Sequence, residues 1–249
     1  MIIFTHIPRT SGKYIETCLF PKKLHNVKKF HKKLMRISLD GSYTIDSDVD
    51  IIGGHIPYGI HKYLNTSCKD FKYIVFLRDP IKRWISEFNH SIIFTSFVRP
   101  IWNECKGHKD FLKRCLSEER NTNIMTKQIS GLEKFDNVIQ DHKNYMFMWA
   151  ARKSKYSAME MQEMLDVAKH NLSEKYEYVG ITSSGYHKKM CKHFGWTYKK
   201  NSRINVSSKT VTDWSVYKPQ IEDLNYYDMQ LFEFARNLCR KRFKTSKQK

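Results

Sequence analysis

Short runs of apolar residues mark the predicted β-strands. The clearest is residues 73–77, "YIVFL", a continuous run of aromatic, β-branched and aliphatic side chains. Such a run is typical of a parallel strand that is buried on both faces. Residues 2–7 ("IIFTHI"), Ile51 and Ile52 before a Gly-Gly pair, and residues 176–181 ("YEYVGI") show similar runs, so we expect further strands there.

Apolar residues with helical spacing mark segments between and after these strands. Asp79 can cap a helix, and Pro80 suits the first helical position. Three segments carry an apolar stripe that repeats every three or four residues. Their apolar positions are Ile81, Trp84, Ile85 and Phe88; Met161, Met164, Leu165, Ala168 and Leu172; and Leu224, Tyr227, Leu231, Phe234 and Leu238. A further helix is expected to end at Gly195.

The alternation of strands and helices predicts an α/β domain with a mainly parallel sheet, whose ligands bind at the carboxyl ends of the strands. With 249 residues, 41% of them hydrophobic, a single domain over residues 1–249 can bury a sizeable core. Residues 91–158 are aromatic-rich with unclear breaks, and we expect a helical insertion or lobe. Residues 240–249 are expected to form a frayed basic tail.

The chain is strongly basic, with 44 Lys and Arg against 25 Asp and Glu and a formal charge of +19. This charge predicts an anionic partner, and it fits nucleic acid, an acidic polysaccharide, an anionic membrane surface or a small polyphosphate-like cofactor equally well. The six cysteines are scattered, which favours reduced thiols. No secretion signal and no apolar run of ~18 residues is present, so we expect a cytoplasmic protein without a transmembrane segment.

Residues 7–15, "IPRTSGKYI", lie between the first predicted strand and a helix that begins near Gly12. Backbone N–H groups at a helix N-terminus bind anions. Further donors and charge come from Arg9, Thr10, Ser11 and Lys13. The sequence therefore predicts a loop that holds a phosphate or sulfate group without a metal ion.

A P-loop kinase or NTPase is the alternative for this loop. Its motif is G-x-x-x-x-G-K-[ST], but Ile7 stands at the first glycine and Tyr14 at the hydroxyl position. Asp79, at the end of a strand, has the position of a helix cap rather than that of a magnesium ligand. The motif thus fails at both of its defining ends, and the kinase remains the weaker hypothesis.

Two segments resemble the cofactor motifs of sulfotransferases. "FTHIPRTSGKYIE" resembles the 5′-phosphosulfate loop, F-x-H-x-P-K-T-G-G-T-S, and "IVFLRDPIKRWISEF" resembles the 3′-phosphate motif, R-D-P-x-x-R-x-x-S. Between them, "GGHIPYGIH" resembles the G-H segment of carbohydrate sulfotransferases related to heparan sulfate and uronyl 2-O-sulfotransferases. The resemblance implies a P-loop-like three-layer fold that binds 3′-phosphoadenosine 5′-phosphosulfate (PAPS), leaves PAP as product, and sulfates a carbohydrate hydroxyl.

The resemblance also implies roles for single residues. Arg9 stands where the family usually has a catalytic lysine, and its role would be electrostatic because a guanidinium does not donate a proton at neutral pH. The residues implied to bind the cofactor are Arg9, Thr10, Ser11, Gly12, Lys13 and Tyr14 at the 5′ end and Arg78 and Ser86 at the 3′-phosphate. An arginine fork suits a phosphate. Arg83 matches the second arginine of the motif but fits a structural role equally well.

His55, in the G-H segment, is the predicted general base, because histidine titrates in the useful range and the resemblance places the catalytic histidine there. His6, His61 and Glu16 are the reserve candidates. The expected acceptor is an acidic glycan or glycoconjugate, with no nucleic acid partner and no metal site. A non-enzymatic nucleic acid binder would also fit the charge, but the two spaced cofactor motifs argue against it. Related animal enzymes are Golgi-anchored, so the Golgi lumen is the alternative location if this sequence is part of a longer protein.

Overall fold

A computed structural model describes residues 1–20, 27–29, 43–45, 49–93, 105–117, 122–131, 156–182, 185–200 and 213–245 of the chain. Its centre is a five-stranded sheet in the order β2-β4-β1-β6-β7, in which every pair of neighbours is parallel. The strands are β1 (Ile2–Thr5), β2 (Val27–Lys29), β4 (Ile51–Gly54), β6 (Lys72–Leu77) and β7 (Tyr176–Ile181). A second, two-stranded sheet pairs β3 (Tyr43–Thr44) with β5 (Leu64–Asn65).

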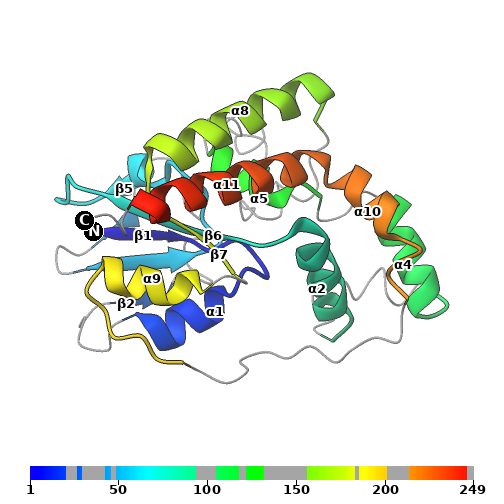
Figure 1. The fold of residues 1–249 in the computed structure, drawn as a ribbon, viewed down its shortest axis with the longest axis horizontal. Helices are drawn as coiled ribbons and strands as arrows, with labels where there is room; N and C mark the ends of the chain where they lie inside the picture. Colours follow the sequence, from blue (N-terminus) through cyan, green and yellow to red (C-terminus); the bar gives the residue numbers. More distant parts are fainter. Residues whose placement is uncertain are drawn as a thin grey trace.

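Helices cover both faces of the large sheet (Figure 1). On one face lie α5 (Ile124–Ser130), α8 (Ala158–Glu174) and α11 (Tyr226–Thr245). On the other face lie α1 (Gly12–Tyr14), its continuation η1 (Ile15–Leu19), which is a π-helical segment, and α9 (Tyr186–His193). The predicted α/β class, with a central parallel sheet between helical layers, is therefore confirmed.

The central strands are buried on both sides because both of their faces are covered. From Tyr73 to Leu77 every residue of β6 is at most 2% exposed, and Ile3, Phe4, Ile51 and Ile52 are fully buried. This explains why their sequences read as continuous apolar runs rather than as an alternation of apolar and polar residues.

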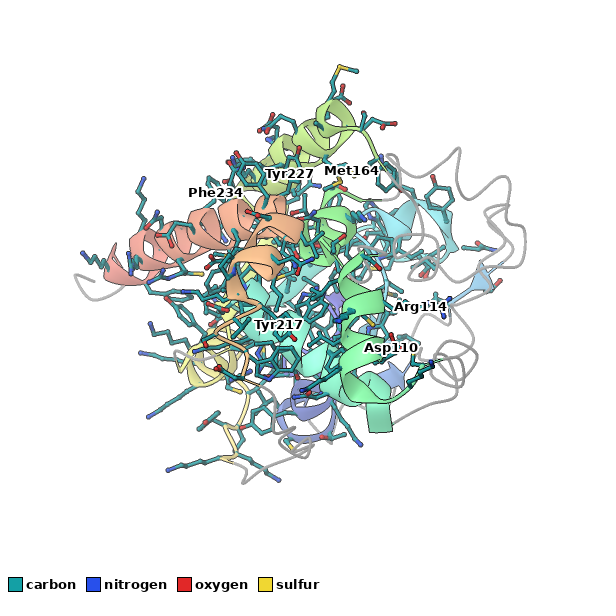
Figure 2. The ribbon with its side chains drawn as sticks, turned by 90° about the vertical axis from the view of Figure 1, so that its right-hand side faces the viewer. Asp110, Arg114, Met164, Tyr217, Tyr227 and Phe234 are labelled. Atoms are coloured by element: carbon teal, nitrogen blue, oxygen red, sulfur yellow. The ribbon has the colours of Figure 1, made fainter. Side chains whose placement is uncertain are left out.

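Helix α2 (Pro80–Ile93) packs in a second hydrophobic cluster beyond the edge of the sheet, as its apolar stripe predicts. Trp84 and Phe88 are buried there against Phe111 and Leu112 of α4 (His108–Ser117) and Ile221 of α10 (Lys218–Leu224). Figure 2 looks onto this side of the molecule, with α4 and its labelled residues in front. The Asp79 Oδ1 atom accepts a hydrogen bond from Lys82 N (2.9 Å), so the predicted helix cap is confirmed.

The last helix differs from its prediction in two ways. Its buried stripe is Asp228, Leu231, Ala235 and Cys239, whereas Phe234 and Leu238 flank that stripe and are only partly buried. The helix also continues to Thr245, so the frayed tail expected from residue 240 is wrong as far as the structure describes the chain. Arg242 anchors this end by donating hydrogen bonds to the Leu172, Ser173 and Tyr176 carbonyls.

Of the segment 91–158, the structure describes the end of α2, α4, α5 and the residues that lead into α8. Helix α5 is buried along its whole length and contacts both α8 and α11. Whether the segment forms a lobe stays a prediction, because residues 132–155 lie outside the described residues. A short 3-10 helix, η3 (Ile60–Tyr63), precedes β5. No helix within the described ranges is long and apolar enough to cross a bilayer.

Candidate active site

The predicted site residues follow the carboxyl ends of three neighbouring strands. In the sheet, Thr5 of β1 pairs with Gly54 of β4 and with Val75 of β6. His6, His55 and Arg78, each of which follows the end of its strand, therefore emerge at one edge of the sheet. β1 lies between β4 and β6, which is the kind of position where open α/β sheets bind their ligands.

The loop after β1 has an unusual backbone. Arg9 and Ser11 have φ angles of 67° and 70°, although left-handed backbone favours glycine. Thr10 is fully buried, and its N–H and hydroxyl both donate to the Ile7 carbonyl (3.3 and 2.8 Å). Thr10 thus stabilises the loop from within, while Ser11, the residue before α1, makes no side-chain capping bond.

Position 12 requires a glycine because it packs closely against the ring of His6. A Cβ atom at this position would lie 1.9 Å from two atoms of that ring. The His6 ring cannot easily retreat, since it stacks on Phe4 (5.6 Å between centroids) and contacts the His55 ring (4.4 Å). The loop and the end of β1 are therefore packed as one unit.

The two cofactor motifs, far apart in the sequence, meet at Arg9. The Arg9 Nε atom donates a hydrogen bond to Ser86 Oγ (3.0 Å), and Arg78 Nη1 donates to the Arg9 carbonyl (3.0 Å). Arg9 and Arg78 are both half-buried and Ser86 is buried. The structure thus brings together Arg9, Arg78 and Ser86 at the carboxyl edge of β1 and β6.

The electrostatics of this cluster favour an anion. Burial lowers the pKa of Arg9, opposed by the nearby Glu87 carboxylate. Burial also lowers the pKa of Arg78, and the charges of Arg9 and Arg83 lower it further. Two partly desolvated guanidinium groups that repel each other are stabilised by a bound phosphate or sulfate, so this cluster fits the predicted cofactor class.

His55 has a defined orientation. Its Nδ1 atom lies 2.7 Å from the carbonyl oxygen of His6. A carbonyl can only accept a hydrogen bond, so Nδ1 must carry the proton and Nε2 carries the lone pair in the neutral ring. This is the tautomer that a general base needs if Nε2 faces the substrate.

Of the reserve bases, His6 and Glu16 are bound to each other beneath the loop. His6 Nδ1 lies 3.0 Å from Glu16 Oε1, and both side chains are buried. The other edge of the His6 ring lies against Gly12. Both groups therefore support the loop from below.

Tyr14 and Lys13 lie in the first turn after the loop. Lys13 is exposed, and the hydroxyl of Tyr14 donates to the Lys199 carbonyl (2.6 Å). The Tyr14 ring also makes an edge contact with His187, whose pKa burial lowers to about 4. Tyr14 thus joins the loop to the segment that follows α9.

Arg83 lies close enough to Arg78 for its charge to lower the pKa of that residue. It is fully buried, and its Nε atom is 4.0 Å from Asp228 Oδ2, so it joins α2 to α11. His61 is remote from the cluster, because its Nδ1 atom bonds the Tyr73 hydroxyl (2.7 Å) near the amino end of β6. Five residues separate Tyr73 from Arg78, which is about 16 Å in a strand.

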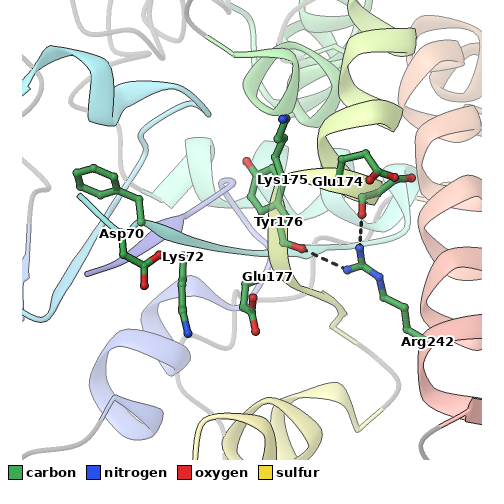
Figure 3. A pocket seen from close by; sticks show the side chains of 9 residues that line it. Asp70, Lys72, Glu174, Lys175, Tyr176, Glu177 and Arg242 are labelled. Atoms are coloured by element: carbon green, nitrogen blue, oxygen red, sulfur yellow. Dashed lines mark hydrogen bonds between the residues drawn. The ribbon is translucent and has the colours of Figure 1, made fainter. Parts of the chain in front are cut away.

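The opposite edge of the sheet has a different character. A hollow of about 340 Å³ opens there, with Asp70, Lys72, Glu177 and Arg242 among its lining residues (Figure 3). Its walls carry both signs of charge, and Arg242 already binds backbone carbonyls (Figure 3). Two neighbouring arginines, Arg9 and Arg78, are found at the carboxyl edge instead.

Two residues of the site had no signal in the sequence. Glu87 is buried beside Arg9, and Gln128, in α5, donates hydrogen bonds from Nε2 to the carbonyls of His6 (3.2 Å) and Ile56 (3.1 Å). Gln128 comes from the segment in which no motif could be recognised. Only the folded structure brings it beneath His55.

Comparison with known proteins identifies the class. The sequence model of the sulfotransferase family matches residues 2–235, so the chain belongs to this family, as the two motifs predict. Over 195 residues the chain is 24% identical to human (Homo sapiens) heparan-sulfate 6-O-sulfotransferase 3. That alignment covers 72% of this chain but only 40% of the relative, so the chain corresponds to less than half of that protein.

Proposed function

We propose that this sulfotransferase is a PAPS-dependent O-sulfotransferase that acts on a hydroxyl group of a carbohydrate. The contact of Arg9 with Ser86 and Arg78 carries the proposal, because it joins the two predicted cofactor motifs beside His55. Family membership supports sulfuryl transfer, and the similarity to a heparan-sulfate enzyme supports a carbohydrate acceptor.

The donor would be held between the two motifs. The backbone at the start of α1, together with Arg9 and Ser11, would bind the 5′-phosphosulfate, and Arg78 and Ser86 would bind the 3′-phosphate. When bound, PAPS supplies an activated sulfuryl group attached to phosphate through a bridging oxygen. Arg9 would stabilise the negative charge that develops on that oxygen as the S–O bond breaks. Its guanidinium stays charged at neutral pH, so it acts without donating a proton.

His55 would act as the general base. With its proton on Nδ1 bound to the His6 carbonyl, Nε2 can accept the proton of the acceptor hydroxyl as that oxygen bonds to sulfur. The acceptor is proposed to be an acidic glycan, because the net charge of +19 would attract a polyanion.

The direct test is transfer of label from sulfur-labelled PAPS to a panel of acidic and neutral glycans. We expect label in an acidic glycan and a loss of about 10²–10⁴-fold in the rate of label transfer in the His55→Ala variant.

The kinase alternative is tested in parallel by thermal shift. PAP without metal should stabilise the protein by ~2.7 kcal/mol at 100 times its Kd, whereas ATP with Mg²⁺ should not. Stabilisation by ATP and Mg²⁺ alone would replace the proposed function with a kinase or NTPase.

A further inference from the structure

We infer that Gln128 is a positioning residue that holds His55 in its basic tautomer through the backbone carbonyl of His6. The inference rests on the proposed role of His55 as general base. Neither cofactor motif contains Gln128, which lies in α5, more than 70 residues along the chain from His55.

The amide of Gln128 links the two backbone segments that carry the histidines. Its Nε2 atom lies 3.2 Å from the His6 carbonyl and 3.1 Å from the Ile56 carbonyl. The same His6 carbonyl accepts the Nδ1 proton of His55, at 2.7 Å. Because both neighbours of Nε2 are carbonyl oxygens, the donating end of the amide must face them.

Gln128 is itself held firmly. Its side chain is fully buried. Its backbone carbonyl accepts a hydrogen bond from the backbone N–H of Tyr58 (3.2 Å), which lies in the segment just after His55. At the other end of α5, the N–H groups of Met125 and Thr126 bind the Asp228 carboxylate. The helix that carries the amide is thus fixed at both ends.

A carbonyl oxygen has two lone pairs, so the His6 carbonyl can accept from Gln128 and His55 together. The bond from Gln128 fixes the direction of this carbonyl, and the carbonyl in turn keeps the proton of His55 on Nδ1. Without the amide, the carbonyl can turn away from His55, and the ring can then carry its proton on Nε2. A protonated Nε2 has no lone pair with which to accept the proton of the acceptor hydroxyl. In metal sites, mutation of a residue that orients a reacting group through an intervening hydrogen bond typically lowers metal affinity or activity by ~10–100-fold.

The other half of the amide adds no hydrogen bond to the described part of the fold. Among the described residues, Gln128 Oε1 is buried without a hydrogen-bond partner. A buried acceptor without a partner lowers stability, whereas an apolar side chain of the same shape does not carry that cost. The donor side of Gln128 is therefore the side with a function.

Asn171 provides a matched control. It is also a buried amide, and its Nδ2 atom also donates to two carbonyls, those of Ile129 (2.9 Å) and Ser130 (3.2 Å) at the end of α5. Among the described residues, the hydrogen bond of His55 Nδ1 goes to the His6 carbonyl and not to either of these two. Gln128 lies in α5, and Asn171 lies in α8 and bonds the end of α5, so Gln128→Met and Asn171→Leu each remove two amide–carbonyl bonds made by α5. Only the first removes a bond to the carbonyl that orients His55.

We expect kcat of Gln128→Met to fall about 10–100-fold with the KM for PAPS within about twofold, while Asn171→Leu keeps kcat within about twofold. Gln128→Glu keeps the shape but places carboxylate oxygens against two carbonyls, so it should lose at least as much activity near neutral pH. Equal losses in Gln128→Met and Asn171→Leu, or an unchanged kcat in Gln128→Met, would overturn the inference.

Ring ¹⁵N NMR of His55 provides a readout that needs no substrate. The unmodified protein should show a protonated Nδ1, and Gln128→Met should shift the population toward a protonated Nε2, with Asn171→Leu unchanged. An unchanged tautomer in Gln128→Met overturns the positioning role. Absence of sulfuryl transfer in the unmodified protein would instead overturn the proposed function, so the two failures can be told apart.

Discussion

The two ends of α5 lie in two buried polar clusters that differ in how their polar groups are used. At its beginning, the junction with α11, Asp228 accepts hydrogen bonds from Met125 N (3.1 Å), Thr126 N (2.7 Å) and Thr126 Oγ1 (2.8 Å). At its end, Gln128 reaches the active-site edge with one half of its amide bonded and the other half unpartnered among the described residues.

At this junction the first turn of α5 is capped by Asp228 of α11 rather than by the side chain of the residue that precedes the helix. Asn123, the residue before α5, makes no side-chain capping bond. Its side chain instead donates to the Leu224 carbonyl and accepts from the N–H groups of Tyr227 and Asp228. The carboxylate oxygens of Asp228 are both partnered, by Met125 and Thr126, and Oδ2 also lies 4.0 Å from Arg83 Nε. Such a network contributes to stability, whereas the strained loop at the site, with its partly buried arginines, is available for a ligand.

Removing Asp228 tests this comparison with the largest expected effect. Asp228→Ala leaves the buried Arg83 without its nearby carboxylate and the start of α5 without acceptors. We expect a loss of about 3–5 kcal/mol in the free energy of unfolding, measured by urea denaturation. Asp223→Ala, an exposed aspartate in α10, is the control and should change stability by less than ~0.5 kcal/mol. A loss below ~1 kcal/mol for Asp228→Ala would show that the junction does not stabilise the fold.

Removing Arg9 should give the opposite result, loss of activity with the fold retained. Arg9→Ala is expected to lower kcat/KM for sulfuryl transfer about 10²–10³-fold, because it removes the cation nearest the proposed bridging oxygen. Arg9→Lys should recover only part of this activity, since an ammonium group cannot reproduce the planar fork that reaches Ser86. Arg236→Ala, in an exposed pair with Glu233 on α11, should leave activity unchanged. Full activity in Arg9→Ala would remove Arg9 from the mechanism.

Gly12→Ala tests how tightly the loop is packed. The new Cβ would overlap the His6 ring, which is hemmed in by Phe4 and His55, so we expect a loss of about 1–3 kcal/mol in stability and weaker PAP binding by calorimetry. Gly53→Ala is the matched control, because its Cβ would meet its nearest neighbour at an ordinary 3.5 Å. Equal tolerance of the two substitutions would contradict the packing described for Gly12.

The junction should also show itself in the pH dependence of stability. Burial raises the pKa of Asp228 above its ordinary value of 3.8, with Arg83 and the Thr126 and Met125 hydrogen bonds opposing the shift. As pH rises above 3.8, the unfolded chain loses this proton before the folded protein does, so the contribution of Asp228 to stability falls. Asp228→Asn should remove that decline, which is at most ~1.4 kcal/mol per pH unit for one group. Urea midpoints of the two proteins between pH 4 and pH 7 measure it, and parallel curves would contradict the shift.

The fold and most of the candidate site could be predicted because their signals are local. A continuous apolar run identifies a buried parallel strand such as β6, and the resemblance to the two sulfotransferase motifs implied one site for Arg9, Arg78 and Ser86, which the structure brings together. The loop around Gly12 was likewise found from its position between a strand and a helix. These features depend on neighbours in the sequence, so the sequence shows them directly.

The features that could not be predicted depend on packing between distant segments. Helix α5 is buried on all sides and includes Lys127 and Gln128, so it lacks the apolar stripe of a surface helix. On α11 the spacing of large apolar residues predicts that Phe234 and Leu238 are buried, but the fully buried positions include Asp228 and Ala235. A buried aspartate or a small alanine has no hydrophobic signal, and its partners are known only once the chain has folded.

Replacing Ser11 tests the strain in the loop and has the smallest expected effect. Ser11 has a φ angle of 70° at the position where the resembled motif has its first glycine. Left-handed backbone costs a non-glycine residue about 1–2 kcal/mol, whereas glycine adds about 0.4–1 kcal/mol of chain entropy to the unfolded state. Ser11→Gly should therefore stabilise the protein slightly, by up to ~1 kcal/mol in urea denaturation, while it removes a hydroxyl that is proposed to bind the phosphosulfate. A modest rise in stability accompanied by weaker PAP binding would mean that the Ser11 hydroxyl contributes to binding, and that the protein tolerates a strained backbone at this position for that reason. Tighter PAP binding would mean instead that the backbone N–H groups hold the anion and that the hydroxyl adds nothing.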